Sequence, residues 1–289
     1  MRVRWALAVA ALGGLLASCG PGGDHRVQVV ASFYPLAWVA SEVGGPRVSV
    51  EDLTPPGGEA HEATLGASQR AAVEDAAIVL VLGFGFQPDI ERAAADASGT
   101  VVRVADGLAL MPGGDDLRYD PHVWLDPPMM RSIVEEVAGA LRAVDRAGAE
   151  GYRRRAAALD EELRSLDAAY REGLADCAYR TIVVTHEAFG YLARRYRLRQ
   201  VGIEGLAPES EPTAAAVQAA IQAIRSGAAA PAVFHEATPE GVRTGRGVAQ
   251  DAGVPALALS TLESPPASGD YLSVMRRNLE VLREGLRCR

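Results

Sequence analysis

Three of the five histidines of this chain lie in separate short motifs that could together bind a metal ion. His61 lies in PPGGEAHEA, His122 in DPHVWLDP and His186 in VVTHEAFGYL, each in a loop context or at the end of an apolar run. Imidazole is the commonest metal ligand at neutral pH, and three imidazoles with one further donor complete the tetrahedral shell of Zn²⁺. The histidines are 61 and 64 residues apart, so only the tertiary fold could bring them together.

Apolar runs typical of β-strands alternate with helical patterns through most of the chain. In the first half we expect strands at 27–31, 48–50, 78–82 and 101–104, and helices over 35–43, 66–74 and after His122. In the second half we expect strands at 181–184, 201–203, 232–234 and 254–259, and a final helix over about 270–286. This alternation predicts parallel βαβ units, and such sheets bind ligands beyond the carboxyl ends of their strands.

One long helix is predicted between the two halves. Apolar side chains recur there at three- and four-residue steps, at Tyr152, Ala156, Leu159, Leu163, Leu166, Tyr170 and Leu174. A helix over 148–174 would be about 40 Å long. It could pair with a coiled-coil partner, but its position between two α/β halves favours a bridge across both. The predicted fold class is therefore α/β, with two similar lobes joined by one long rigid helix. Each lobe is a mostly parallel four-stranded sheet flanked by helices, and the metal site lies in the cleft between lobes.

The first residues of the chain predict an exported lipoprotein. Arg2 and Arg4 precede an apolar run, 5–16, that is too short to span a bilayer. The run ends in LASC, which resembles the lipobox at which a bacterial signal peptide is cut before a lipidated cysteine, here Cys19. An ordinary secretory signal with a chance cysteine is the alternative. The small residues before Cys19 and the GPGG tether after it favour lipidation, and two or more acyl chains would give stable anchoring.

Composition indicates a folded, acidic, extracytoplasmic protein. The net charge of −8 becomes −10 once Arg2 and Arg4 leave with the signal, and without a basic cluster we expect no nucleic-acid partner. Two cysteines then remain, Cys177 and Cys288. In an oxidising compartment they could form a disulfide, worth up to roughly 4–5 kcal/mol in the chain-entropy model, or they could stay as buried thiols.

The motifs also carry a resemblance. The chain resembles the zinc/manganese-type solute-binding proteins of bacterial ABC transporters over essentially the whole mature sequence. The matching segments are VVASFYPLAWVA, PGGEAHEA, DPHVWLDP, THEAFGYLARRYRL, GIEGLAPESEPTAAAV and GDYLSVMRRNLEVL. The resemblance implies two lobes joined by one rigid helix, a transported metal ion, and a membrane permease with a separate ATPase as partners.

The resemblance also implies the ligand set. The metal ligands of the family correspond to His61, His122 and His186, with a fourth carboxylate from the last loop between strand and helix, which we assign to Glu263 in TLESPPASGDYL. Competitors for the fourth position are Glu204, Glu236 and Asp270. His235 is a rival histidine that we interpret as structural, and we expect His25, in the tether, to be solvated.

The donor types favour zinc. Three imidazoles and one carboxylate suit Zn²⁺, whereas Mn²⁺ favours more oxygen ligands. In the family, a histidine at the place of His186 implies zinc and a carboxylate implies manganese. A zinc hydrolase or hydratase is the alternative from another class. However, the places where a metalloprotease helix needs its second histidine hold Leu65, Gly190 and Pro239, and a fourth protein ligand leaves no open position for an activated water.

These observations predict a monomeric zinc carrier held at the membrane by its lipid. We expect a signal peptide at 1–18, the lipidated cysteine and tether at 19–26, an N-terminal lobe at 27–147, a connecting helix at 148–174 and a C-terminal lobe at 175–289. The expected function is capture of Zn²⁺ outside the cytoplasm and delivery to an ABC permease for import. A manganese-binding protein or a lipid-anchored adhesin of the same fold is the alternative.

Overall fold

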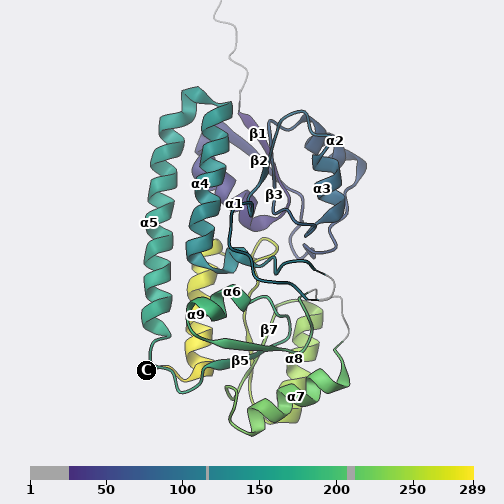
Figure 1. The fold of residues 1–289 in the computed structure, drawn as a ribbon, viewed down its shortest axis with the longest axis vertical. Coiled ribbons are helices and arrows are strands. Elements are labelled where there is room, and N and C mark those ends of the chain that lie inside the picture. Colours follow the sequence, from purple (N-terminus) through teal and green to yellow (C-terminus); the bar gives the residue numbers. More distant parts are fainter. Residues whose placement is uncertain (1–25, 115–116, 207–211) are drawn as a thin grey trace, which may run out of the picture.

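Two parallel four-stranded sheets form the centres of two lobes, which Figure 1 shows one beyond the other along the long axis of the molecule. The structure is a computed structural model that describes residues 26–114, 117–206 and 212–289. The predicted signal peptide, the lipidation site Cys19 and the tether as far as His25 lie outside the described residues. No helix in the described ranges is long and apolar enough to cross a membrane.

The N-terminal lobe has the strand order β2-β1-β3-β4, with every neighbouring pair parallel. Its strands are β1 (Val27–Ala31), β2 (Val48–Asp52), β3 (Ile78–Val81) and β4 (Thr100–Arg103). Its helices are α1 (Tyr34–Gly44), α2 (Ala67–Asp75), α3 (Pro88–Ala94) and α4 (Pro127–Val144), with 3₁₀ turns η1 (Gly45–Arg47), η2 (Val123–Leu125) and η3 (Arg146–Gly148). Helix α3 was not predicted, because its seven residues are too few to show a helical period.

The C-terminal lobe repeats this topology as β6-β5-β7-β8, again with parallel pairs. Its strands are β5 (Thr181–Val184), β6 (Arg199–Gly202), β7 (Val233–His235) and β8 (Ala256–Ala258). Its helices are α6 (Gly190–Arg195), α7 (Ala214–Arg225), α8 (Pro239–Ala252) and α9 (Tyr271–Leu286). The predicted fold class of two similar α/β lobes is therefore confirmed.

Helix α5 (Ala149–Gly173) is the predicted bridge. Figure 1 shows it beside α4 along one flank, running past both lobes. Near its start, the guanidinium of Arg155 donates to the carbonyls of Val43 and Gly44 at the end of α1, at 2.7 and 2.6 Å. Near its end, the hydroxyl of Tyr170 donates to the carbonyl of Met275 in α9, at 2.7 Å. One continuous helix is therefore bonded to both lobes.

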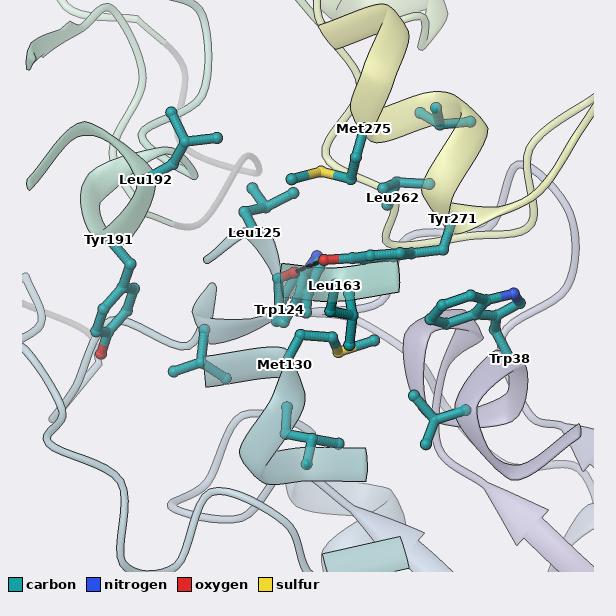
Figure 2. Close-up of a cluster of buried hydrophobic side chains, with 14 of the residues drawn as sticks. Trp38, Trp124, Leu125, Met130, Leu163, Tyr191, Leu192, Leu262, Tyr271 and Met275 are labelled. Carbon is teal, nitrogen blue, oxygen red and sulfur yellow. Dashed lines mark hydrogen bonds between the residues drawn. The ribbon is translucent and has the colours of Figure 1, made fainter. Parts of the chain in front are cut away.

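The two lobes also share a hydrophobic core, part of which is drawn in Figure 2. The ring of Trp38 in α1 stacks on that of Tyr271 in α9, with centroids 4.7 Å apart. The hydroxyl of Tyr271 donates to the carbonyl of Trp124 in η2 at 2.5 Å. Met130 of α4 and Leu163 of α5 belong to the same cluster, together with Leu262 and Met275 of the C-terminal lobe (Figure 2). Because side chains from both lobes fill one core, relative motion of the lobes would disturb packed apolar contacts.

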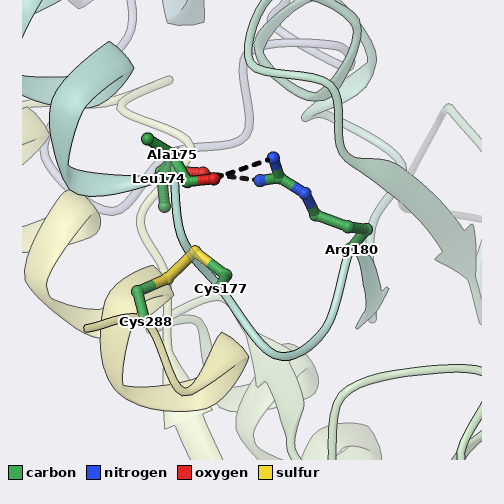
Figure 3. The surroundings of a disulfide bond; sticks show 5 residues. All are labelled: Leu174, Ala175, Cys177, Arg180 and Cys288. Carbon is green, nitrogen blue, oxygen red and sulfur yellow. Dashed lines mark hydrogen bonds between the residues drawn. A yellow bond between two sulfur atoms is a disulfide. The ribbon is translucent and has the colours of Figure 1, made fainter.

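The sequence left open whether the last two cysteines pair, and the structure joins Cys177 to Cys288 in a disulfide (Figure 3). Cys177 follows α5 and Cys288 follows α9, so the bond links the ends of these two helices. Beside it, the guanidinium of Arg180 donates to the carbonyls of Leu174 and Ala175 at 2.5 and 3.3 Å (Figure 3). The C-terminus is thereby held against the end of the bridging helix.

Candidate metal centre

Four side chains from both lobes converge where the carboxyl ends of the two sheets face each other. One ligand atom from each of His61, His122, His186 and Glu263 lies within 4.8 Å of those of the other three. His61 follows β2 and His122 follows β4, at the two edges of the first sheet. His186 follows β5, and Glu263 follows β8. Strand order and direction therefore build the site from loops that are far apart in sequence.

The three imidazole rings surround one point. Their centroids are 5.4 Å apart for His61 and His122, 5.5 Å for His61 and His186, and 4.8 Å for His122 and His186. Oε1 of Glu263 lies 3.7 Å from Nε2 of His61 and 3.6 Å from Nε2 of His122. These two nitrogens and both carboxylate oxygens of Glu263 are buried and have no hydrogen-bond partner in the part of the chain that the structure describes. Buried polar atoms without partners are costly, and a cation at this point would satisfy them together.

His122 is the most firmly oriented ligand candidate. It is fully buried, and its Nδ1 lies 2.8 Å from Oδ1 of Asp120. Because a carboxylate only accepts, Nδ1 carries the proton and Nε2 is left to face the other candidate ligands. Burial disfavours the charged imidazole, but the hydrogen bond to Asp120 and the negative charges of Asp120 and Glu263 outweigh it and raise the pKa of His122 to about 9. Burial likewise opposes ionisation of Glu263, but His122 and His61 outweigh it, and its pKa lies well below the usual value.

His186 has its own outer partners. Its Nδ1 lies 2.8 Å from Oε1 of Glu236, the residue after β7, and its Nε2 lies 3.1 Å from the carbonyl oxygen of Leu206. Glu236, one of the competitors for the fourth position, thus lies beside a candidate ligand and outside the group of four. One of the two ring nitrogens must be free of its proton when the ring binds a metal ion.

His61 lies on the loop between β2 and α2. Its ring and the ring of Phe86 lie edge to face, with centroids 4.8 Å apart. The backbone just before it is held by Gln87, whose amide donates to the carbonyl of Ala60 at 3.0 Å and to that of Ser32 at 3.2 Å. Within the described residues, no carboxylate orients the ring of His61 from behind as Asp120 orients that of His122.

The other competitors lie elsewhere. Asp270 is the N-cap of α9, where its Oδ1 accepts from the backbone N–H of Ser273 at 2.8 Å. The ring of His235 is turned to the backbone, with Nδ1 2.6 Å from the carbonyl oxygen of Glu236. Glu204 follows β6 and is outside the group of four.

Sequence reasoning assigned no role to Asp120 and did not find Gln87. Asp120 stands two residues before His122 in the DPH motif, a spacing that could have suggested it as an orienting carboxylate. Gln87 contacts Ala60 across 27 residues of sequence, and no local pattern reveals such a contact.

The donor set fits a zinc ion. Three imidazole nitrogens and a carboxylate oxygen are typical ligands of four-coordinate Zn²⁺, and the buried position keeps competing water away. A ligand group that comes entirely from the protein differs from the open sites of catalytic zinc, which keep one position for water.

Comparisons with known proteins agree with this chemistry. A family model described as zinc-uptake complex component A, periplasmic, matches residues 29–285. The zinc-binding lipoprotein AdcA of Streptococcus pneumoniae is 30% identical over 90% of this chain and 56% of its own length, so the chain spans about half of that relative. The high-affinity zinc uptake system protein ZnuA of Bacillus subtilis is 25% identical over 94% of each chain.

A solved structure matches the fold as well as the sequence. The crystal structure of the Zn(II)-bound ZnuA-like domain of Streptococcus pneumoniae AdcA superposes with a TM-score of 0.77 at 31% identity, covering 90% of this chain and 99% of that one. The family model covers almost all of the described chain, and the two-lobed fold agrees with it. This protein therefore belongs to the periplasmic zinc-uptake complex component A (ZnuA) family.

Proposed function

We propose that this protein captures Zn²⁺ outside the cytoplasm and delivers it to an ABC permease that works with a separate ATPase. The observation that carries the proposal is the convergence of His61, His122, His186 and Glu263 from both lobes on one buried point. The names of the relatives, a zinc-binding lipoprotein and a high-affinity zinc uptake protein, support zinc as the metal.

The residues of the chain suggest how capture works. The two imidazoles of the N-terminal lobe and the donors of the C-terminal lobe replace the water shell of the ion. Asp120 keeps the proton of His122 on Nδ1, away from the ion. Because all four ligands come from the protein, the bound ion has no place for an activated water, and we propose a carrier rather than an enzyme. Lipidation at Cys19 would keep the carrier beside its permease.

The test is metal analysis of the protein after unfolding and refolding in a mixture of Zn²⁺ and Mn²⁺. We expect one zinc ion per chain, and loss of that zinc in His186→Ala. His235→Ala is the matched control, because His235 is also buried and ends the neighbouring strand β7 but lies outside the group of four. Unchanged zinc in His186→Ala would refute the ligand assignment. Preferential loading with manganese would refute zinc as the metal, and hydrolase or hydratase turnover by the zinc-loaded protein would refute the carrier.

A further inference from the structure

A second group of carboxylates lines the cleft beside the candidate metal centre. Among the residues that the structure describes, a hollow of about 490 Å³ is bordered by five glutamates from both lobes and by no basic residue: Glu59, Glu62, Glu204, Glu236 and Glu240. A second hollow of about 340 Å³ contains Glu263 in its wall and shares Glu59 and Glu236 with the first. The acidic hollow is therefore continuous with the wall of the four-donor centre.

Two of these glutamates are built into the sheet that carries His186. Glu204 follows β6 and Glu236 follows β7, the two strands that flank β5. The backbone N–H of Glu204 donates to the carbonyl of Thr185 at 2.8 Å, next to His186. Adjacent parallel strands thus present a carboxylate, an imidazole and a second carboxylate at the same edge.

Both carboxylates are buried, and one of them has an oxygen without a partner. Glu204 is 6% exposed, and its Oε1 has no hydrogen-bond partner among the described residues. Glu236 is 7% exposed, and its Oε1 faces Nδ1 of His186 at 2.8 Å. Burial raises the pKa of Glu204, and neighbouring Glu236 and Glu240 raise it further against the opposing effects of Thr244 and His186. Two carboxylates that border one hollow in a poorly solvated place repel each other, and a bound cation would relieve that repulsion.

Glu240 lies on the same hollow and differs in one respect. It is exposed and forms an ion pair with Arg243, three residues along α8. Its charge is therefore already matched in the protein, which makes it the natural control for Glu204.

We propose that Glu204 and Glu236 form an outer carboxylate station that binds an incoming divalent cation, still partly hydrated, before the ion passes to the four-donor centre. Two carboxylates and water are hard oxygen ligands, which hold divalent ions loosely and exchange them readily. A cleft lined by carboxylates also concentrates cations and raises their association rate. The station deepens the proposed zinc-binding function and rests on it.

The first test is the rate of Zn²⁺ association with the whole protein, measured by stopped flow at several ionic strengths. Glu204→Gln should lower the association rate constant by roughly tenfold and flatten its dependence on salt, while the dissociation rate stays unchanged. Glu204→Asp keeps the charge and should associate almost as fast as the unmodified protein. Glu240→Gln should change the rate less than twofold. Equal slowing in Glu204→Gln and Glu240→Gln, or no slowing in either, would overturn the station.

A second test observes the station directly. With zinc already in the four-donor centre, added Mn²⁺ should bind once and weakly, seen as loss of the free Mn²⁺ signal by electron paramagnetic resonance. Glu204→Gln should abolish that binding and still hold one zinc per chain. Weak Mn²⁺ binding that survives in Glu204→Gln would refute the station and leave the carrier untouched, whereas unchanged zinc in His186→Ala would refute the ligand assignment on which the station rests.

Discussion

The two segments of the N-terminal lobe that carry histidines are held in opposite ways. The segment 120–126, with His122, is bonded to the C-terminal lobe, whereas the loop 55–66, with His61, is bonded to its own lobe. The ties of the first segment are Tyr191 to the carbonyl of Asp120 at 2.8 Å, Trp124 to the carbonyl of Thr261 at 2.7 Å, Tyr271 to the carbonyl of Trp124 at 2.5 Å and Arg195 to Asp126 at 2.9 Å.

The hydrogen bonds of the second segment stay within the N-terminal lobe. The amide of Gln87 holds Ala60, and the carboxylate of Asp89 accepts from the backbone N–H of Leu65 at 2.9 Å. His122 and His61 are both in the N-terminal lobe by chain order. The hydrogen bonds nevertheless hold the segment of His122 against the C-terminal lobe, which carries His186 and Glu263. Three candidate ligands therefore form a preorganised part of the site, and His61 completes it from the other lobe.

Removal of single histidines should give the largest difference between the two segments. Zinc binding by a complete site is worth about 10–16 kcal/mol, so one ligand accounts for roughly a quarter of it, or 10²- to 10³-fold in affinity. His122→Ala should lower zinc affinity more than His61→Ala, because the ring of His122 is already oriented by Asp120 and loses little freedom when the ion binds. Competition with a zinc chelator measures both affinities. Equal losses would contradict the inference that His122, His186 and Glu263 form a preorganised part of the site.

A pH series should separate the two histidines next. The pKa of His122 is raised from 6.5 to about 9. Its protonation therefore stabilises the metal-free protein fully below about pH 6.5, and this stabilisation is lost as pH rises through 9, by at most about 3 kcal/mol. Thermal unfolding of the metal-free protein should show a falling midpoint over this range.

The same raised pKa predicts that zinc displaces about one proton at pH 7, seen by calorimetry in buffers of different ionisation enthalpy. The midpoint of His61→Ala should keep the pH dependence, and that of His122→Ala should lose it. A pH-independent midpoint in the unmodified metal-free protein would contradict the pairing of His122 with its carboxylates.

Asp120→Asn should have a smaller effect than loss of a ligand. The substitution keeps a hydrogen-bonding side chain behind His122 but removes the charge that raises the basicity of its ring. Partners behind metal-bound histidines typically contribute 10- to 100-fold in metal affinity. We expect a loss in that range, measured by chelator competition. An unchanged affinity would mean that the packing around His122, and not the hydrogen bond to Asp120, orients its ring.

The fold and the four ligand candidates were accessible from the sequence for different reasons. Alternation of apolar runs and helical patterns predicted the parallel strands, and the three-and-four spacing from Tyr152 to Leu174 predicted α5. The resemblance, and not the spacing, supplied Glu263. Its place among the three histidines in the structure supports that assignment as a proposal.

What the sequence did not indicate is how the two histidine segments differ. The ties of Trp124 to Thr261 and of Tyr191 to Asp120 span 137 and 71 residues, and no local pattern encodes them. Chain order assigned His122 to the N-terminal lobe, but chain order does not reveal which lobe a loop packs against.

The smallest effects are expected from two substitutions that distinguish segment 120–126 from the loop 55–66 and leave every candidate ligand in place. Tyr271→Phe removes the hydroxyl that ties segment 120–126 to α9, and Gln87→Met removes the amide that holds Ala60. The first change leaves a buried carbonyl unpaired inside the core shared by both lobes, so it should lower the free energy of unfolding by about 1–2 kcal/mol with or without zinc. The second leaves the carbonyl of Ala60 without its donor and should lower the free energy of unfolding by a similar amount. Because Ala60 precedes His61, it should in addition make zinc dissociate about fivefold faster.

Chemical denaturation and zinc release to excess chelator measure these two quantities on the same samples. If segment 120–126 moves with the C-terminal lobe, Tyr271→Phe shifts the unfolding midpoint and scarcely changes zinc release, while Gln87→Met shifts the midpoint and also speeds zinc release. The opposite result, with faster release in Tyr271→Phe alone, would mean that the ties across the lobes open during release and that His122, not His61, is the ligand that leaves first.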